Sequence, residues 1–369
     1  MAVTLEGKNK FVPPPDLGNK CPEDDVRRFI TDCMKAVGVP QENALLMADI
    51  LVEADKRGHY SHGLLRTEMY LADMLKKLCD PCATPTVLKE NASTALVDGN
   101  NGLGPVVSKF CMDLAIKKAR ETGIGWICNR GSNHYGIAGV WAMKAAEEGM
   151  IGMSFTNTSS LVVPTRSVKP VLGTNPIALA APAEGGNFVL DMATSVVAGG
   201  KVEKKVYEGK PLPENWSLDK EGNPTTDAKK GLEGFLLPLG GAEETSGYKG
   251  FGLGMMVEIF CGIMSGGTYG PNIRDWTKAD RPADISHCFV AIDPSCFAPG
   301  FESRLGDLMN YCRNVQPVDP QKPVMVAGDP ERINSEKMKA DGGITYDMSL
   351  IEEMWKLAKY LGVKPLQSV

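Results

Sequence analysis

The sequence predicts an α/β protein with a helical layer at its N-terminal end, and three observations lead to that class. Residues 1–90 keep their apolar positions at helical spacing and show little strand pattern. From residue 92 onward, short apolar strands alternate with amphipathic helices. Hydrophobic residues make up 43% of the 369-residue chain and charged residues 23%, which is typical of a soluble globular protein with a sizeable core.

An extended arm and three helices are expected in the N-terminal part. Residues 1–20 are polar and contain three successive prolines, which favours an extended arm. The acidic run 23–25 directly after Pro22 favours a helix start, because carboxylates complement the positive end of the helix dipole. The three helices are expected between residues 21 and 38, 40 and 58, and 64 and 77.

The central part is expected to build a sheet. A strand, a glycine-containing loop, a helix and a second strand follow one another between residues 124 and 155, an order that indicates a βαβ-like unit. Residues 204–232 are rich in Lys, Gly, Pro and Asp, and are interpreted as a surface excursion. Strands are expected at 95–98, 124–128, 151–155, 177–182, 188–194 and 288–292, and helices at 106–121, 140–148, 255–264, 301–312 and 349–361.

Charge and composition argue against several classes of protein. The formal net charge is −5 and the Lys and Arg residues are scattered, whereas a nucleic-acid-binding surface needs a basic stripe. No apolar run approaches the ~20 residues needed to cross a bilayer, so we expect no membrane partner. The N-terminal residues lack the apolar stretch of a secretory signal, and we expect a cytoplasmic protein.

The ten cysteines are expected to be reduced, because they are dispersed over a long chain without a secretion signal. Cys79 and Cys82 have the spacing of a metal-binding or redox pair, but no second Cys/His pair follows nearby. His59 and His62 have the spacing of a chelating pair but lack an adjacent acidic or cysteine partner. We therefore expect no metal site.

The placement of histidine points to an active site. Three of the four histidines lie in two short glycine-flanked clusters, 57–63 and 132–139. The unperturbed pKa of imidazole lies nearest neutral pH, which suits proton transfer in either direction. The second cluster follows a predicted strand, where catalytic groups of α/β sheets tend to lie. A single histidine in such a place would more readily be an ordinary core or turn residue.

A glycine-rich segment, 247–254, carries Lys249 ahead of an apolar helix. Such a turn at a helix N-terminus can cradle a phosphate, although an ordinary loop with a solvated lysine shows the same pattern. The dinucleotide-binding pattern G-x-G-x-x-G occurs nowhere in the chain. The G-x-S-x-G elbow, the Walker A motif and H-E-x-x-H are also missing, which removes the commonest hydrolase, NTPase and zincin interpretations.

Five segments in this order resemble the type-2 malate/L-lactate dehydrogenase family. That family also includes L-sulfolactate and ureidoglycolate dehydrogenases, diketogulonate reductase and a cyclic-imine reductase. The resemblance covers nearly the whole chain, roughly 22–362. The segments are RGHYSHGLLR at 57–66, SNHYG at 132–136, GTNP at 173–176, DMAT at 191–194 and YKGFG at 248–252.

The resemblance implies a non-Rossmann NAD(P)-binding sheet domain of the L-sulfolactate dehydrogenase-like type, with a helical domain built from both chain ends. We accordingly expect an N-terminal arm and helical layer over 1–90 and a cofactor-binding α/β domain over 91–300. A C-terminal segment, 301–369, is expected to complete the helical domain. Members of this family form intimate homodimers, so a homodimer is expected.

The resemblance also implies an NAD(P)-dependent oxidoreductase that moves a hydride between the nicotinamide cofactor and a small 2-oxo or 2-hydroxy acid. Malate and oxaloacetate are the default pair. The alternatives are a sulfolactate or lactate dehydrogenase and a reductase of a cyclic imine or keto-sugar acid. A non-catalytic relative would show damaged motifs, and those here are intact. NAD is expected and NADP is the alternative, because the sequence does not show where Arg166 and Lys169, near the adenosine region, point.

For catalysis, the family assigns the acid/base role to one or the other of the two histidine motifs. We prefer His62, supported by Ser61 and Asp191 as a relay, and expect His134 to bind substrate or cofactor; the reverse assignment stays open. Arg66 suits the substrate carboxylate, because a guanidinium binds a carboxylate in bidentate fashion.

Tyr70, one helical turn after Arg66, is expected to add a hydrogen bond to the substrate. Each of these residues also has a purely structural alternative: Tyr70 only packs, Arg66 pairs with a surface acid, and Asp191 caps a loop. In the loop around Gly328 this chain has Ala-Gly-Asp where the family has Pro-Gly-Glu. The cofactor-binding residues that the resemblance implies are Thr158, Thr174, Asp191, Met192, Ala193, Lys249 and Gly328.

Overall fold

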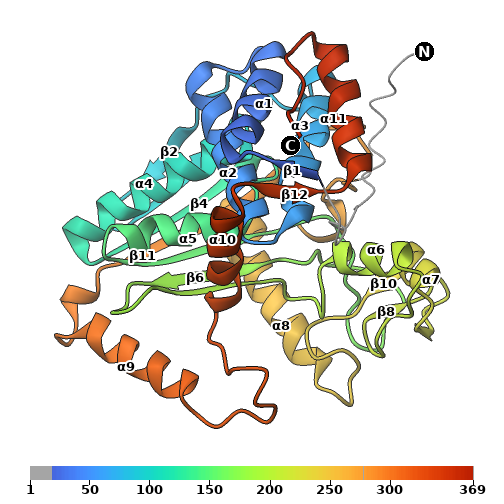
Figure 1. Cartoon of the computed structure of the whole chain (residues 1–369). Helices are drawn as coiled ribbons and strands as arrows, with labels where there is room; N and C mark the ends of the chain where they lie inside the picture. The colour runs from blue at the N-terminus through green and yellow to red at the C-terminus, as the bar shows by residue number, and fades with distance from the viewer. Residues whose placement is uncertain (1–18, 277, 369) are drawn as a thin grey trace.

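A seven-stranded mixed sheet forms the centre of the computed structural model, which describes residues 19–276 and 278–368 (Figure 1). The strand order is β2-β3-β4-β11-β5-β6-β7. The strands are β2 (Thr86–Glu90), β3 (Thr94–Asp98), β4 (Ile124–Ser132), β11 (Ile285–Ile292), β5 (Ile151–Thr156), β6 (Ile177–Ala181) and β7 (Phe188–Met192). The α/β class expected from the sequence is confirmed.

The βαβ-like unit expected between residues 124 and 155 is present with one addition. Helix α5 (Ala138–Glu147) connects β4 to β5. Strand β11, from much later in the chain, lies between these two strands and is antiparallel to both. A second βαβ unit precedes it, in which α4 (Gly104–Thr122) connects the parallel neighbours β3 and β4. The loop that carries His134 is thus anchored to the middle of the sheet.

Helices cover both faces of the sheet. Helices α4 and α5 pack on one face through small and apolar side chains such as Ala115 and Trp141, both fully buried. Helix α8 (Gly247–Glu258) and the wider turn η3 (Ile259–Ile263) pack on the other face, against Phe155. Close approach is possible here because the helix is rich in glycine: a Cβ at Gly250 would lie 2.1 Å from the Leu239 carbonyl oxygen.

That finding corrects the interpretation of segment 247–254. We expected a glycine-rich turn followed by a helix from residue 255, but the helix already begins at Gly247. Its first residues therefore form helix backbone and not a phosphate-cradling loop. The glycines serve the packing against residues 194 and 239.

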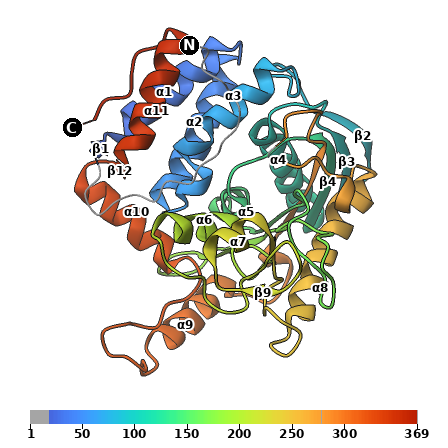
Figure 2. The ribbon, with the colours of Figure 1, turned by 90° about the vertical axis from the view of Figure 1, so that its right-hand side faces the viewer.

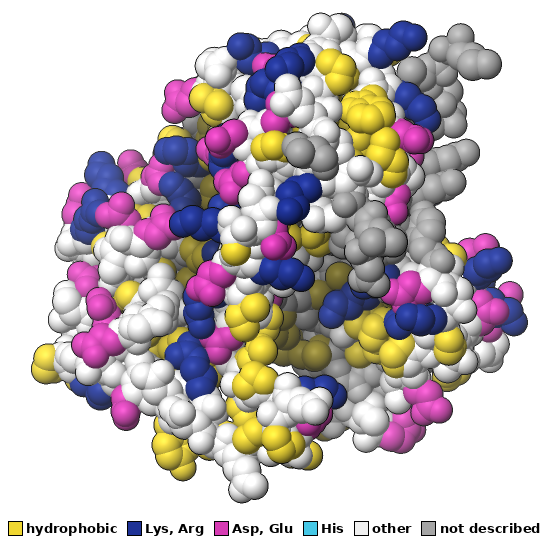
Figure 3. Space-filling view, viewed as in Figure 1, with side chains coloured by type: hydrophobic (Ala, Val, Ile, Leu, Met, Phe, Trp, Pro, Cys, Tyr) yellow, Lys and Arg dark blue, Asp and Glu magenta, His cyan; other side chains and the backbone are white. Residues whose placement is uncertain are grey.

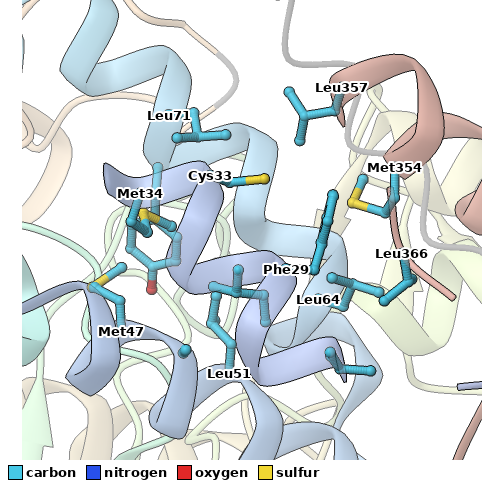
Figure 4. Packing of buried hydrophobic residues seen from close by; sticks show 14 of the residues in the cluster. Phe29, Cys33, Met34, Met47, Leu51, Leu64, Leu71, Met354, Leu357 and Leu366 are labelled. Carbon is cyan, nitrogen blue, oxygen red and sulfur yellow. The ribbon is translucent and has the colours of Figure 1, made fainter. Parts of the chain in front are cut away.

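The N-terminal helices form a separate layer with its own core (Figure 4). Phe29 and Cys33 of this layer face Met354 and Leu357, which come from the C-terminal helix. Burying side chains of this size is worth about 1.5–3 kcal/mol each, so the two chain ends hold each other in place. The helices are α1 (Glu23–Ala36), α2 (Gln41–Lys56), α3 (Thr67–Leu75) and α11 (Met348–Leu361).

A two-stranded ribbon also joins the chain ends. Strand β1 (Asn19–Cys21) pairs with β12 (Ile344–Tyr346). The extended arm expected over residues 1–20 thus ends in a strand, and residues 1–18 lie outside the described part of the chain. In the part that is described, no helix is long and apolar enough to cross a membrane.

The segment interpreted as a surface excursion, 204–232, belongs to a small lobe over residues 199–236 with structure of its own. It contains α6 (Gly199–Tyr207), α7 (Ala228–Glu233) and a three-stranded sheet. Figure 2 shows this lobe below the N-terminal helices. Val202 and Leu212 belong to its apolar core. The strands are β8 (Ser217–Leu218), β9 (Pro224–Thr225) and β10 (Phe235–Leu236).

Two helices complete the C-terminal part. Helix α9 (Phe301–Arg313) matches the expectation closely, and it lies well away from the N-terminal layer (Figure 1). Helix α10 (Asp329–Asp341) was not expected. Of its residues only Asp329 is buried, so it lacks the apolar periodicity from which helices are predicted. The edge strand β2 was missed for the same reason, because its side chains are exposed.

Candidate active site

The two histidine clusters meet in space. His62 ends a one-turn 3-10 helix, η1 (Tyr60–His62), below the N-terminal layer, and His134 follows β4 at the sheet. Their ring centroids are 5.4 Å apart. Both line a cavity of about 180 Å³. The face in Figure 3 is hollowed between the N-terminal layer and the lobe, and no histidine is visible on it.

A buried carboxylate positions the His62 turn. Asp55, near the end of α2, accepts hydrogen bonds from the backbone N–H of Leu64 at 2.8 Å and from the hydroxyl of Tyr346 at 2.6 Å. Burial raises the pKa of Asp55 to about 7, although both hydrogen bonds act in the opposite direction. The carboxylate thereby connects the first histidine turn to strand β12 near the C-terminus.

The His62 ring is oriented by its neighbour in sequence. The Ser61 hydroxyl lies 2.9 Å from Nδ1, which leaves Nε2 for a substrate. Burial, followed by the nearby His134 and Arg66, holds the pKa of His62 well below its usual value of 6.5. His62 is therefore neutral at pH 7, which is the form that accepts a proton.

The His134 ring is oriented from the opposite side. The Tyr70 hydroxyl lies 2.6 Å from its Nδ1. Burial, aided by the positive charge of Arg66, lowers the pKa of His134 to about 3. Tyr70 thus contacts His134 and lines the same cavity, where we expected a substrate ligand. Burial raises the pKa of the Tyr70 hydroxyl, so it stays protonated.

Arg66 lies in the cavity wall as a buried cation. It is 9% exposed, and its Nε donates to the Ser61 carbonyl oxygen. Its Cζ lies 5.4 Å from the centroid of the Trp276 ring. Among the described residues its Nη1 has no hydrogen-bond partner. Burial lowers the pKa of Arg66 and Glu203 counteracts this, but a guanidinium remains charged in proteins. The group is placed to receive an anionic ligand.

A third part of the wall carries hydroxyl groups beside open space. Thr158 and Thr174 line the cavity, and the Thr174 N–H donates to the Thr158 hydroxyl at 2.9 Å. Beside them, residues 198–200 at the start of α6 carry no large side chain. A Cβ added at Gly199 would meet no atom within 4 Å. Hydroxyl groups and open space next to the histidines suit a flat polar ring.

Asp191 does not join His62 in the arrangement that we expected. Its carboxylate accepts a hydrogen bond from the Gly139 N–H at 2.7 Å. It lines a second, much smaller cavity with Arg57, His59 and Glu331. Burial raises the pKa of Asp191, and the nearby His59 acts against this. Asp191 therefore lies beside His59, in a cavity separate from the one that His62 lines, and its part in a relay with Ser61 and His62 stays a prediction.

The remaining residues proposed for the cofactor do not line the histidine cavity. Met192 pairs with Ile177 at the end of β7. Lys249 is exposed, with its Nζ 5.9 Å from the Tyr248 ring centroid. Gly328 has a φ of +98° and lies against Val189 of β7. Together with Ala193, these positions stay predictions.

A second arginine in the cavity was not expected from the sequence. Arg274 and Trp276 line it from the loop before β11, where no periodicity marks them. Arg274 forms a bidentate ion pair with Asp73 of α3, with nitrogen–oxygen distances of 2.7 and 3.1 Å. Asp73 could have been found, because it continues the helical face of Arg66 and Tyr70 at a spacing of three residues.

The fourth histidine supports the second cluster. His287 on β11 is fully buried, and its ring stacks on Tyr135 with centroids 4.3 Å apart. Its Nε2 lies 2.9 Å from the Ser132 hydroxyl and its Nδ1 lies 2.8 Å from that of Thr156. The residues on both sides of His134 are thus braced by the sheet.

The spacing of Cys79 and Cys82 serves no shared ligand. Cys79 is buried and Cys82 is exposed, and both thiols are free. Within the described ranges, no group of three or more His, Cys, Asp or Glu side chains is arranged to hold a metal ion.

Comparisons with known proteins find relatives over nearly the whole chain. Residues 21–355 match the protein family described as malate/L-lactate dehydrogenase. The chain is 41% identical to malate dehydrogenase of Pyrococcus horikoshii, over 94% of this chain and 97% of that protein. It is 35% identical to L-sulfolactate dehydrogenase of Methanocaldococcus jannaschii, over 93% and 97% of the two chains.

Structural similarity is equally extensive. The crystal structure of malate dehydrogenase from Entamoeba histolytica superposes with a TM-score of 0.90 at 32% identity, over 94% of this chain and 99% of that one. Two relatives carry the cofactor in their names: (2R)-3-sulfolactate dehydrogenase (NADP(+)) of Chromohalobacter salexigens and ureidoglycolate dehydrogenase (NAD(+)) of Escherichia coli. The protein is therefore an oxidoreductase, and the chain belongs to the malate/L-lactate dehydrogenase family.

Proposed function

We propose that this protein transfers a hydride between a nicotinamide cofactor and a small 2-oxo or 2-hydroxy acid, with malate and oxaloacetate as the first pair to test. The observation that carries the proposal is the meeting of His62 and His134 beside the buried Arg66 in one cavity. Such a site combines a proton carrier with a cation for the substrate carboxylate. The relatives named malate dehydrogenase support the choice of substrate.

Arg66 positions the substrate. Its Nη1 nitrogen has no protein partner in the described part of the chain and lies among cavity-lining residues, so a substrate carboxylate supplies the missing acceptor. Charge-assisted hydrogen bonds of this kind are roughly twice as strong as neutral ones. The Trp276 ring and the Ser61 carbonyl hold the guanidinium in place.

His62 carries the proton. In oxidation the neutral imidazole takes the proton of the substrate hydroxyl at Nε2, while Ser61 keeps Nδ1 oriented. In reduction the protonated ring returns it to the carbonyl oxygen. His134, held by Tyr70, donates or accepts a hydrogen bond at the same oxygen. The nicotinamide cofactor supplies or receives the hydride when bound beside Thr158 and Thr174.

We favour NAD over NADP. Arg166, the basic residue proposed for the adenosine region, is already paired with Glu243 through a hydrogen bond of 2.8 Å from Nε. A 2′-phosphate needs a basic group near the ribose, and this one has an internal partner. NAD lacks that phosphate and needs no such group.

We also propose a cytoplasmic homodimer. All ten cysteines are free thiols, in keeping with a reducing compartment.

The proposed dimer interface is an apolar stripe that helix α8 and the turn after it expose. Burial of these side chains against a second copy would remove apolar surface from water. The stripe is formed by Tyr248, Met255, Ile259 and Ile263, which are 41–52% exposed. The division into 1–90, 91–300 and 301–369 also stays a proposal.

The test is to follow NADH and NADPH oxidation by absorbance against a panel of substrates. The panel contains oxaloacetate, pyruvate, sulfopyruvate, diketogulonate and piperideine-carboxylate. We expect turnover of oxaloacetate with NADH. Turnover restricted to the keto-sugar acid or the cyclic imine would favour those alternatives, and no turnover of any 2-oxo acid would contradict the proposal.

A further inference from the structure

Two buried guanidinium groups line the same cavity, and the function proposed above needs only one of them. Arg66 is 9% exposed and Arg274 is 8% exposed. Arg66 Nη1 and Arg274 Nε are both buried and without a hydrogen-bond partner among the described residues. We infer that Arg274 is a specificity-determining residue that binds a second acidic group of the substrate, so the enzyme selects diacids. This inference rests on the proposed function.

Arg274 is held rigidly. Its Nη1 and Nη2 donate to the two carboxylate oxygens of Asp73, and Nη1 also donates to the Arg281 carbonyl at 2.9 Å. Its own carbonyl oxygen accepts from the Ser159 hydroxyl at 2.7 Å. These contacts use both terminal nitrogens and leave Nε as the donor still to be satisfied.

The position of the pair explains why Nε stays available. Asp73 follows Tyr70 on α3, so the carboxylate approaches Arg274 from the N-terminal layer. The arginine itself comes from the sheet side, in the loop that ends at β11. Because Asp73 holds the far end of the guanidinium, the side chain has no freedom to turn Nε toward another protein acceptor.

A buried donor without a hydrogen-bond partner costs free energy. A substrate that supplies the acceptor therefore binds more tightly than one that does not. A site built to hydrogen-bond a substrate group rejects the analogue that lacks the group, because its own polar atoms are then left unpaired. A substrate with one carboxylate accepts a hydrogen bond from Arg66 and leaves Arg274 Nε without a hydrogen-bond partner. A substrate with a second carboxylate or sulfonate three or four atoms away satisfies both.

The cavity is close to neutral before a substrate binds. Its ionised lining groups are Arg66, Arg274, Asp73 and Glu203, while the two histidines are neutral. Asp73 accompanies Arg274, and Glu203 lies close enough to Arg66 to favour its charge. The free cavity is thus near neutrality, and each guanidinium adds a directed donor for an anionic oxygen.

The experiment compares oxaloacetate with pyruvate, which lacks the second acid, in steady-state reduction with NADH. For the wild-type protein we expect kcat/KM to favour oxaloacetate by at least about 100-fold, within the discrimination that an unpaired polar group produces. In the double variant Arg274→Gln with Asp73→Asn, which leaves no lone buried charge, that preference should fall below about 10-fold, mainly through KM for oxaloacetate.

The matched control removes another ion pair that includes a buried cation. Lys118 is 7% exposed and pairs with Glu90 at 3.0 Å, but neither residue lines the cavity. The double variant Lys118→Gln with Glu90→Gln should keep the wild-type preference. Circular dichroism establishes that each variant is folded.

A binding measurement separates this inference from the proposed function. By calorimetry, succinate, whose carboxylates have the spacing of those in oxaloacetate, should bind the wild-type protein more tightly than butyrate, and the Arg274→Gln/Asp73→Asn variant should lose that difference. A wild-type preference below 10-fold, or a double variant with undiminished preference, would overturn the role of Arg274. If no 2-oxo acid is reduced, the proposed function fails, and the comparison of succinate with butyrate alone decides whether Arg274 binds a second acid.

Discussion

His62 and His134 are both half-buried and have lowered pKa values, yet their Nδ1 atoms contact different hydroxyl groups. Ser61 contacts His62 at 2.9 Å, and Tyr70 contacts His134 at 2.6 Å. Tyr70 joins His134 to a separate element, α3, whereas Ser61 is the residue next to His62 in sequence. This difference favours His134 as the positioning group and His62 as the one that changes protonation state.

Separate replacement of the two histidines tests this division of roles. His62→Ala should lower kcat by about 10²–10⁴-fold, the usual worth of a general acid/base. His134→Ala should raise KM more than it lowers kcat. Near-normal turnover of the His62 variant in steady-state assays would reverse the assignment.

The low pKa of His62 predicts the pH dependence of oxidation. The neutral base is required, and a histidine with lowered pKa stays neutral as the pH falls through 6.5. Activity is therefore lost only below the shifted pKa. We expect kcat/KM for malate oxidation to change little between about pH 7 and pH 5.5, where an ordinary histidine would become mostly protonated. A decline centred near pH 6.5 would show an unshifted group.

At the scale of elements, the ends of α4 and β4 fix the second histidine turn. A Cβ added at Gly104, the first residue of α4, would lie 2.2 Å from the His134 carbonyl oxygen and 2.3 Å from that of Asn133. Neither neighbour is a flexible side-chain end. The glycine lets the helix start directly against the backbone that carries the histidine.

Gly104→Ala should therefore displace the turn. We expect a destabilisation of about 1–3 kcal/mol, as for overpacked sites, measured by urea unfolding. The same variant should show a lower kcat/KM, because His134 moves with its backbone. Lys109→Ala on the exposed side of the same helix removes an ion pair with Asp113 and should cost less than about 0.5 kcal/mol. Equal effects of the two substitutions would contradict the role of the close contact.

At the scale of the whole molecule, the cavity lies where two separately packed bodies meet. The core of the N-terminal layer contains residues from both chain ends, and the sheet has its own cores on its two faces. His62, Arg66 and Tyr70 come from the layer, and His134 and Arg274 come from the sheet side. The site therefore depends on how the two bodies pack.

The proposed homodimer can be broken at the apolar stripe of α8. Ile259→Glu places a carboxylate on a face that we expect to be desolvated in the dimer, which is costly for an unpaired charge. Analytical ultracentrifugation should show a dimer for the wild-type protein and monomer for the variant. Leu232→Glu on α7 alters an apolar side chain of similar exposure, 44% against 45%, and should leave the mass unchanged. A dimeric Ile259→Glu protein would move the interface elsewhere.

Much of the fold could be predicted because its elements carry local signals. The helices near residues 301 and 349 and the strands on both sides of α5 have apolar periodicity that needs no tertiary context. Helix α10 and strand β2 could not be predicted, because they bury too few side chains to leave such a pattern.

The sequence by itself determined the α/β class, the family and the two histidine clusters, since these depend on short motifs and local periodicity. Only the tertiary structure decided that Asp191 faces His59, that β11 separates β4 from β5, and that Arg274 shares a cavity with Arg66. Those facts depend on contacts between segments up to two hundred residues apart. Such contacts depend on how side chains of different layers pack together. The spacing of residues along the chain does not reveal this packing.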